Sequence, residues 1–142
     1  MMKRVIFFLM VIMTAVLAAC GGAEPESAAV ADPAEIDLAT LPEEVDVQTT
    51  AALLGRGDVV VIDVREQWEY DEGHIPGVTH IPLAEVPASL EQIPADKTVI
   101  LTCRSGNRSG QAFDFLQNNG YENVHNMQGG ILAWQAAGLE VE

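Results

Sequence analysis

Apolar residues in the C-terminal two thirds of the chain form short continuous runs that alternate with helix-like segments. The runs are rich in β-branched residues, and we expect strands at 59–64, 78–81, 98–102 and 124–126. Helical patterns lie around them, and we expect helices at 49–54, 83–93, 109–118 and 131–137, the second interrupted by Pro87. Continuous β-branched runs between helices are typical of strands buried on both faces. The pattern therefore predicts an α/β fold with a central parallel sheet covered by helices on both faces.

The N-terminal residues have the pattern of an export signal. Two basic residues precede an apolar run at 5–13 that is shorter than a membrane span requires, so residues 1–19 are predicted to be a signal peptide. The alternative is an uncleaved anchor. The segment 17–20, Leu-Ala-Ala-Cys, resembles the bacterial lipobox, in which Cys20 is acylated and begins the mature chain. The resemblance implies a palmitate-bearing lipoprotein that is exported and anchored to a bacterial membrane, on its periplasmic or outer cell-surface side.

Composition separates a linker from a folded unit. Residues 20–40 are rich in alanine, glutamate, proline and serine and lack a periodic apolar face, so we expect a lipidated, flexible tether. Residues 41–142 suit one compact domain. The chain has 21 acidic and 7 basic residues and a formal net charge of −14, so we expect no nucleic acid partner.

Cys103 follows the predicted strand 98–102 and precedes a polar, basic turn, Arg-Ser-Gly-Asn-Arg-Ser. Arginines and a helix N-terminus beside a thiol lower its pKa and raise the fraction of nucleophilic thiolate. Gly106 and Asn107 tolerate left-handed backbone angles and would turn successive N–H groups inward as an anion-binding nest. Ser109 is suited to be the N-cap of the following helix. The segment is thus predicted to hold a small anion above a sulfur nucleophile, and the turn argues against a simple core cysteine.

This loop resembles the active-site loop of the rhodanese (thiosulfate sulfurtransferase) family in its small, single-domain bacterial form. Segments of the sequence that agree with the family in order and spacing are Asp63-Val64-Arg65, residues 69–77 and residues 129–134. The resemblance covers about residues 45 to 142 and implies a rhodanese-like domain in which Cys103 is catalytic. It implies transfer of a sulfane sulfur from a small anionic donor such as thiosulfate, through a Cys103 persulfide, to cyanide, a thiol or a protein acceptor.

The resemblance also places the substrate against the turn that follows Cys103 and against an arginine at the end of an upstream strand. The expected substrate-binding residues are Arg104, Ser105, Gly106, Asn107, Arg108, Ser109 and Arg65. Arg108 and the loop amides are expected to matter most where charge develops on the leaving group. Two roles stay open for Arg65, which either faces the site or ties its strand end to carboxylates such as those of Glu69 and Glu72.

Three alternatives to a sulfurtransferase stay open. The first is a persulfide carrier or binding module that loads once and does not turn over. The second is a phosphatase or arsenate reductase, which the loop length disfavours. Only Arg104 to Asn107 lie between Cys103 and Arg108, whereas related phosphatases carry a longer loop. The third is an inert lipoprotein that uses the fold as a scaffold.

No cofactor is expected, and no metal site is assigned, because His74, His80 and His125 lack the spacing of metal ligands. The turn around His74 indicates a structural hydrogen-bonding role, and Asp63 is expected to fix loops. The expected partners are a small anionic sulfur donor and, through Cys20, a membrane. A protein sulfur acceptor is a further option, and we expect a monomer.

Overall fold

A computed structural model describes residues 32–142 of the protein. A five-stranded sheet forms the centre of this part of the chain. The predicted signal peptide and Cys20 lie outside the described residues. The strands follow the order β1-β5-β4-β2-β3, and each neighbouring pair is parallel. Their bounds are β1 (Glu44–Val45), β2 (Val59–Asp63), β3 (Thr79–His80), β4 (Thr98–Thr102) and β5 (Val124–Met127). The predicted parallel sheet is confirmed.

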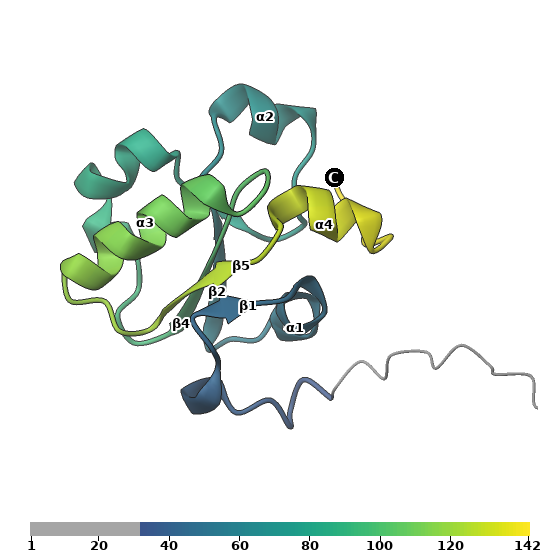
Figure 1. Cartoon of the computed structure of the whole chain (residues 1–142), viewed down its shortest axis with the longest axis horizontal. Coiled ribbons are helices and arrows are strands. Elements are labelled where there is room, and N and C mark those ends of the chain that lie inside the picture. Colours follow the sequence, from purple (N-terminus) through teal and green to yellow (C-terminus); the bar gives the residue numbers. More distant parts are fainter. Residues whose placement is uncertain (1–31) are drawn as a thin grey trace, which may run out of the picture.

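Helices cover both faces of this sheet, as predicted (Figure 1). The α-helices are α1 (Val47–Leu53), α2 (Gln67–Glu72), α3 (Asn107–Asn118) and α4 (Gly130–Ala136). Short 3₁₀ turns add η1 (Leu38–Thr40), η2 (Leu83–Ala88) and η3 (Leu90–Gln92). Helix α3 packs with η2 on one face, whereas α1 and α4 pack together on the other.

Strand β4 is the centre of the core because its side chains serve both faces. Val99 and Leu101 pack in the cluster under α3, and Ile100 packs in the cluster under α1 and α4; all three are fully buried. Each such side chain contributes roughly 1.5–3 kcal/mol of burial free energy. The strand that leads to Cys103 is therefore held rigidly on both sides.

Local chemistry explains where the helices differ from the sequence prediction. Residues 83–93 form two 3₁₀ turns, because Pro87 cannot donate the backbone hydrogen bond that an α-helix needs. Helix α2 was not predicted from periodicity. It is a short helix fixed by a capping box, in which the Glu69 carboxylate accepts from the Glu66 N–H at 3.2 Å.

The folded unit begins before residue 41. Arg56 Nη1 donates to the carbonyls of Pro33, at 2.6 Å, and Ile36, at 3.1 Å. Ile36 and Leu38 pack against the core on the α1 side. The last residues of the predicted tether thus contact the domain. No helix within residues 32–142 is long and apolar enough to span a membrane.

Candidate active site

Cys103 lies at the carboxyl edge of the sheet, where α/β proteins commonly bind ligands. Strand β4 delivers it there, and β2 ends alongside, because Thr102 and Asp63 are neighbours in the parallel register. The topology therefore brings Arg65, two residues beyond Asp63, close to the loop that begins at Cys103.

The Cys103 sulfur receives hydrogen bonds from the loop and from the first turn of α3. The Gly106 N–H donates to Sγ at 3.1 Å, and the Ser109 hydroxyl donates to it at 3.4 Å. Burial raises the pKa of the Cys103 thiol, but the Ser109 hydroxyl and the N–H groups of Ser109, Ser105 and Gly106 together outweigh it, and the pKa lies below its ordinary value. Only 1% of Cys103 is exposed, so hydrogen-bond donors of the protein, and not water, stabilise the thiolate.

Helix α3 begins earlier than expected, and this changes the role of Ser109. Gly106 is the N-cap, with the left-handed backbone at φ 95° that we predicted for it, whereas Asn107 is the first helical residue. The prediction of Ser109 as the N-cap is wrong, because it occupies the third helical position and is fully buried. Its hydroxyl faces the sulfur instead of capping the helix.

The start of α4 holds the loop through hydrogen bonds to its carbonyl groups. The N–H groups of Ile131 and Leu132 donate to the carbonyls of Cys103, at 2.8 Å, and Arg104, at 3.1 Å. A Cβ on Gly130 would overlap the Cys103 carbonyl and come within 2.7 Å of the Arg104 carbonyl. Close approach of the two backbones therefore requires glycine, and it keeps the loop carbonyls engaged while N–H groups face the sulfur.

Arg108 is directed at a carboxylate of α2. Its Nη1 and Nη2 lie 2.6 Å and 2.7 Å from the two Glu69 carboxylate oxygens, a bidentate pair. The hydrogen bond to Glu69 raises the pKa of Arg108, and the nearby Cys103 thiolate adds to this effect. The same hydrogen bond lowers the pKa of Glu69, so both partners are charged. Arg108 is thus close to the sulfur, but its charge is compensated.

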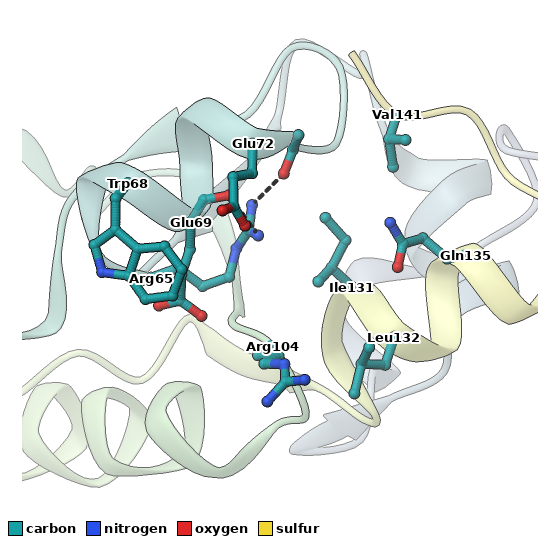
Figure 2. Close-up of a pocket in the computed structure, with 10 residues that line it drawn as sticks. Arg65, Trp68, Glu69, Glu72, Arg104, Ile131, Leu132, Gln135 and Val141 are labelled. Atoms are coloured by element: carbon teal, nitrogen blue, oxygen red, sulfur yellow. Dashed lines mark hydrogen bonds between the residues drawn. The ribbon is translucent and has the colours of Figure 1, made fainter.

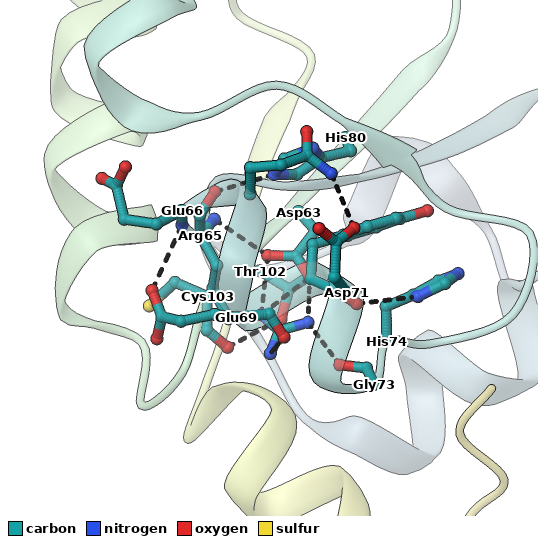
Figure 3. Close-up of polar contacts among 12 residues, drawn as sticks. Asp63, Arg65, Glu66, Glu69, Asp71, Gly73, His74, His80, Thr102 and Cys103 are labelled. Atoms are coloured by element: carbon teal, nitrogen blue, oxygen red, sulfur yellow. Dashed lines mark hydrogen bonds and ion pairs between the residues drawn. The ribbon is translucent and has the colours of Figure 1, made fainter.

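Arg65 ties the end of β2 to α2. Its side chain is 6% exposed and forms an ion pair with Asp63 at 2.7 Å. It also donates to the backbone carbonyls of Glu69, at 3.0 Å, and Gly73, at 2.8 Å (Figure 3). Of the two roles left open for Arg65, this geometry matches the tie, although the carboxylate is that of Asp63. Asp63 also accepts from the Arg65 N–H at 3.0 Å.

A pocket of about 400 Å³ opens beside the loop, between α2 and α4. Figure 2 shows Trp68 and Glu69 from α2 on one side and Ile131 and Leu132 from α4 on the other, with Arg104 at the edge. Its further lining residues are Arg65, Glu72, Gly73, Gln135 and Val141. Arg104 and Arg65 of the predicted substrate-binding set thus line this pocket.

The remaining polar candidates have structural contacts. His74 Nδ1 hydrogen-bonds to the Tyr70 carbonyl at 3.1 Å, and His80 Nε2 hydrogen-bonds to the Arg65 carbonyl at 2.8 Å. Both imidazoles stack on the Tyr70 ring. Among residues 32–142 there is no cluster of histidine, cysteine and carboxylate side chains that could hold a metal ion.

Sequence reasoning missed two supports of the loop and one ion pair. Asn126 Nδ2 donates to the Gly106 carbonyl at 3.2 Å from β5. The family resemblance includes Gly130 within residues 129–134 without giving it a role, and it offers Glu69 as a partner of Arg65 and not of Arg108. The Gly-Gly pair was a signal, since two consecutive glycines before a helix indicate a close backbone approach. Nothing in the local sequence points to Asn126.

Comparison with known proteins agrees with this geometry. The rhodanese-like domain family matches residues 46–137. A sulfurtransferase from Allochromatium vinosum is 37% identical over 99 residues, which cover 69% of this chain and 92% of that protein. A thiosulfate sulfurtransferase from Pseudoalteromonas translucida is 34% identical over 95 residues, covering 67% and 90%. The crystal structure of a rhodanese-related protein from Thermoplasma volcanium matches with a TM-score of 0.65 and 29% identity, covering 71% of this chain and 98% of that one. The chain therefore belongs to the rhodanese family, and its described residues have the rhodanese-like fold.

Proposed function

We propose that this protein is a sulfurtransferase that takes a sulfane sulfur from a small anionic donor such as thiosulfate and holds it as a Cys103 persulfide. It then passes the sulfur to cyanide, a thiol or a protein acceptor. The observation that carries the proposal is the pair of hydrogen bonds to Sγ, from the Gly106 N–H and the Ser109 hydroxyl. These donors favour the thiolate, which is the attacking form of cysteine.

In the first half-reaction the Cys103 thiolate attacks the outer sulfur of the donor. A new S–S bond forms to Cys103, the donor's own S–S bond breaks, and the leaving group departs with the electron pair, as sulfite when thiosulfate is the donor. The persulfide that results carries a terminal negative charge. The N–H groups of Ser105 and Gly106 and the positive end of α3 are suited to stabilise that charge.

In the second half-reaction a thiophilic acceptor attacks the outer sulfur of the persulfide. The bond to Cys103 breaks, and the thiolate is regenerated with its electron pair. With cyanide the product is thiocyanate. The cycle needs no external oxidant or reductant, and a covalent intermediate between two half-reactions predicts ping-pong kinetics.

Intact-mass measurement tests the proposal. Treatment of the full chain with thiosulfate should add the mass of one sulfur, and cyanide should remove it. The Cys103→Ser variant retains Cys20 and should show no gain, which assigns the added sulfur to Cys103. A wild-type protein that gains no mass from any sulfane-sulfur donor would contradict the proposal.

Steady-state assay separates an enzyme from a carrier. A sulfurtransferase should release many equivalents of thiocyanate per chain from thiosulfate and cyanide. Loading of one equivalent followed by a stall would instead support the carrier. Phosphate release from a phosphatase substrate by wild type and not by Cys103→Ser would support the phosphatase alternative.

We further propose that the domain is attached to a membrane through acyl chains on Cys20, by the residues that resemble a lipobox. More than one chain makes such attachment stable. Wild-type protein expressed in a bacterial host should enter the membrane fraction with a mass increased by acylation. The Cys20→Ser variant should stay unacylated, and equal acylation of both proteins would refute this proposal.

A further inference from the structure

The arginines around the sulfur supply less free positive charge than their number suggests. Glu69 holds Arg108 in a bidentate pair at 2.6 Å and 2.7 Å, and Asp63 holds Arg65 at 2.7 Å. Arg104 forms no ion pair with any residue in the range 32–142, and its side chain is exposed at the pocket. The pocket beside the loop, to which Arg104 belongs, therefore offers one uncompensated arginine charge, and Glu72 lines the same pocket with a carboxylate.

Apolar side chains gather at this pocket. Trp68 is 63% exposed, Leu132 is 45% exposed and Val141 is 37% exposed, and these are the exposed large hydrophobic side chains of the described residues. All three line the pocket, although they come from α2, from α4 and from the segment after α4 (Figure 2). Single exposed apolar residues are common, but a group around one cavity indicates a surface that binds an organic group.

The charge present during sulfur transfer differs between donors. Thiosulfate is a dianion, so its reactive complex with the Cys103 thiolate holds three negative charges close together, and like charges at such distances repel strongly. A protonated organic persulfide, R–S–SH, brings no charge, so the complex holds only that of the thiolate. A site with one uncompensated arginine matches the single negative charge of the persulfide complex better than the three negative charges of the thiosulfate complex. The pocket of about 400 Å³ also leaves space for a carbon substituent, which thiosulfate lacks.

We infer that the preferred donor is an organic persulfide whose carbon substituent packs against Trp68, Leu132 and Val141, and that Glu69 sets this preference by compensating Arg108. The inference rests on the proposed function, because it concerns the donor of that same reaction, and it replaces the small inorganic anion named there with an organic persulfide. The Cys103 thiolate attacks the terminal sulfur of R–S–SH, so that an S–S bond to Cys103 forms, the S–S bond of the donor breaks, and R–S⁻ leaves with the electron pair. R–S⁻ then takes the proton of the new Cys103 persulfide, so that R–SH is released and Cys103–S–S⁻ remains.

Truncation of the apolar surface tests the contact with the substituent. The probes are benzyl persulfide, hydroxyethyl persulfide and thiosulfate, and the measurement is kcat/KM with cyanide as acceptor. Trp68→Ala and Leu132→Ala should each lower kcat/KM for benzyl persulfide by about tenfold, as expected when an apolar contact is lost. The loss for hydroxyethyl persulfide and thiosulfate should be at most about twofold. Because both side chains are exposed, their truncation leaves the core intact.

Removal of one carboxylate tests the charge argument. Glu69→Gln retains an oxygen that accepts from the Glu66 N–H, so α2 keeps its cap while Arg108 loses its counter-charge. We expect kcat/KM for thiosulfate to rise about fivefold relative to that for benzyl persulfide, because removal of one negative charge weakens the repulsion of the dianion. The matched control is Glu122→Gln, which changes net charge equally but lies before β5, at the other end of the sheet. Glu122→Gln should leave kcat/KM for thiosulfate and kcat/KM for benzyl persulfide unchanged.

The outcomes separate the inference from the proposed function. If no donor loads Cys103, the proposed function fails. If all donors load it but the apolar truncations affect every donor equally, the substituent does not occupy this pocket and the inference is overturned. The role given to Glu69 is overturned if Glu69→Gln leaves the ratio of kcat/KM for thiosulfate to kcat/KM for benzyl persulfide unchanged. It is also overturned if Glu122→Gln changes this ratio by the same factor.

Discussion

The Ser109 hydroxyl should lower the pKa of the Cys103 thiol, because it donates a hydrogen bond to the sulfur. Ser109→Ala removes the side-chain donor that lies 3.4 Å from Sγ and keeps the Ser109 N–H, which also lowers the thiol pKa. A hydrogen bond to a charged group contributes roughly 1.5–3 kcal/mol, and one pKa unit corresponds to about 1.4 kcal/mol. The contact is long, so the lower end of this range applies. Alanine is also a strong helix former, so α3 should be retained.

The assay is the rate of alkylation by iodoacetamide as a function of pH, with Cys103→Ser as the blank that accounts for Cys20. A small reagent is needed because Cys103 is only 1% exposed. Loss of the hydroxyl should move the midpoint of the alkylation profile to higher pH. If both midpoints lie above neutrality, alkylation at neutral pH should slow by nearly tenfold.

Ser105→Ala is the matched control for this change. It removes a hydroxyl from the same loop but keeps the Ser105 N–H, which is the group that acts on the sulfur. Its alkylation midpoint should stay within about 0.3 units of wild type. If Ser109→Ala leaves the midpoint unchanged, or if Ser105→Ala shifts it equally, then the Ser109 hydroxyl does not stabilise the thiolate and the reasoning is refuted.

Further predictions concern the support of the loop and the stability of the domain. Gly130→Ala should slow Cys103 persulfide formation by at least about tenfold, because a Cβ there meets the Cys103 carbonyl and forces the loop to move. Mass spectrometry of samples quenched at successive times measures the rate of persulfide formation. Asp63→Asn should lower the free energy of unfolding in urea by about 3–5 kcal/mol, because Arg65 is left buried without its partner, whereas Asp58→Asn, in an exposed pair, should cost much less. Folding lowers the pKa of Cys103, so its thiolate stabilises the fold above the pKa of the unfolded thiol, and this contribution is lost as the pH falls through the folded pKa. The free energy of unfolding of wild type relative to Cys103→Ala should therefore be larger at about pH 9.5 than at about pH 6.

The buried strands of this domain could be predicted well from sequence, because burial on both faces produces an unbroken apolar run. The prediction of a strand at 98–102 coincides with β4, and residues 59–64 contain β2. Strand β1 has two residues and helix α2 has six, and segments that short carry no readable period. Their existence depends on tertiary partners, such as the pairing of Glu44 and Val45 with β5.

The nucleophile could be predicted because its surroundings are contiguous in sequence. Cys103, Gly106 and Ser109 lie within one loop and one helical turn, so their proximity follows from chain geometry alone. Asn126 could not be predicted as a support, because it reaches the Gly106 carbonyl from a neighbouring strand. The register of β4 with β5 decides that contact, and a local pattern contains no information about register.

The same limit explains why the charge of the site differs from that expected from sequence. In the sequence, Arg65, Arg104 and Arg108 appear as three cations beside one thiol. The fold then places Glu69 from α2 opposite Arg108, across a sequence separation of 39 residues, and compensates its charge. The thiolate retains nearby a set of hydrogen-bond donors whose orientation is fixed by α3 and α4.

Stabilisation of the Cys103 thiolate should therefore depend more on loop geometry than on ionic strength, because salt screens buried donors less than it screens exposed charges. Alkylation of wild type at constant pH should thus vary little between low salt and about 0.5 M salt, and a steep loss of rate would show that guanidinium charge carries the effect.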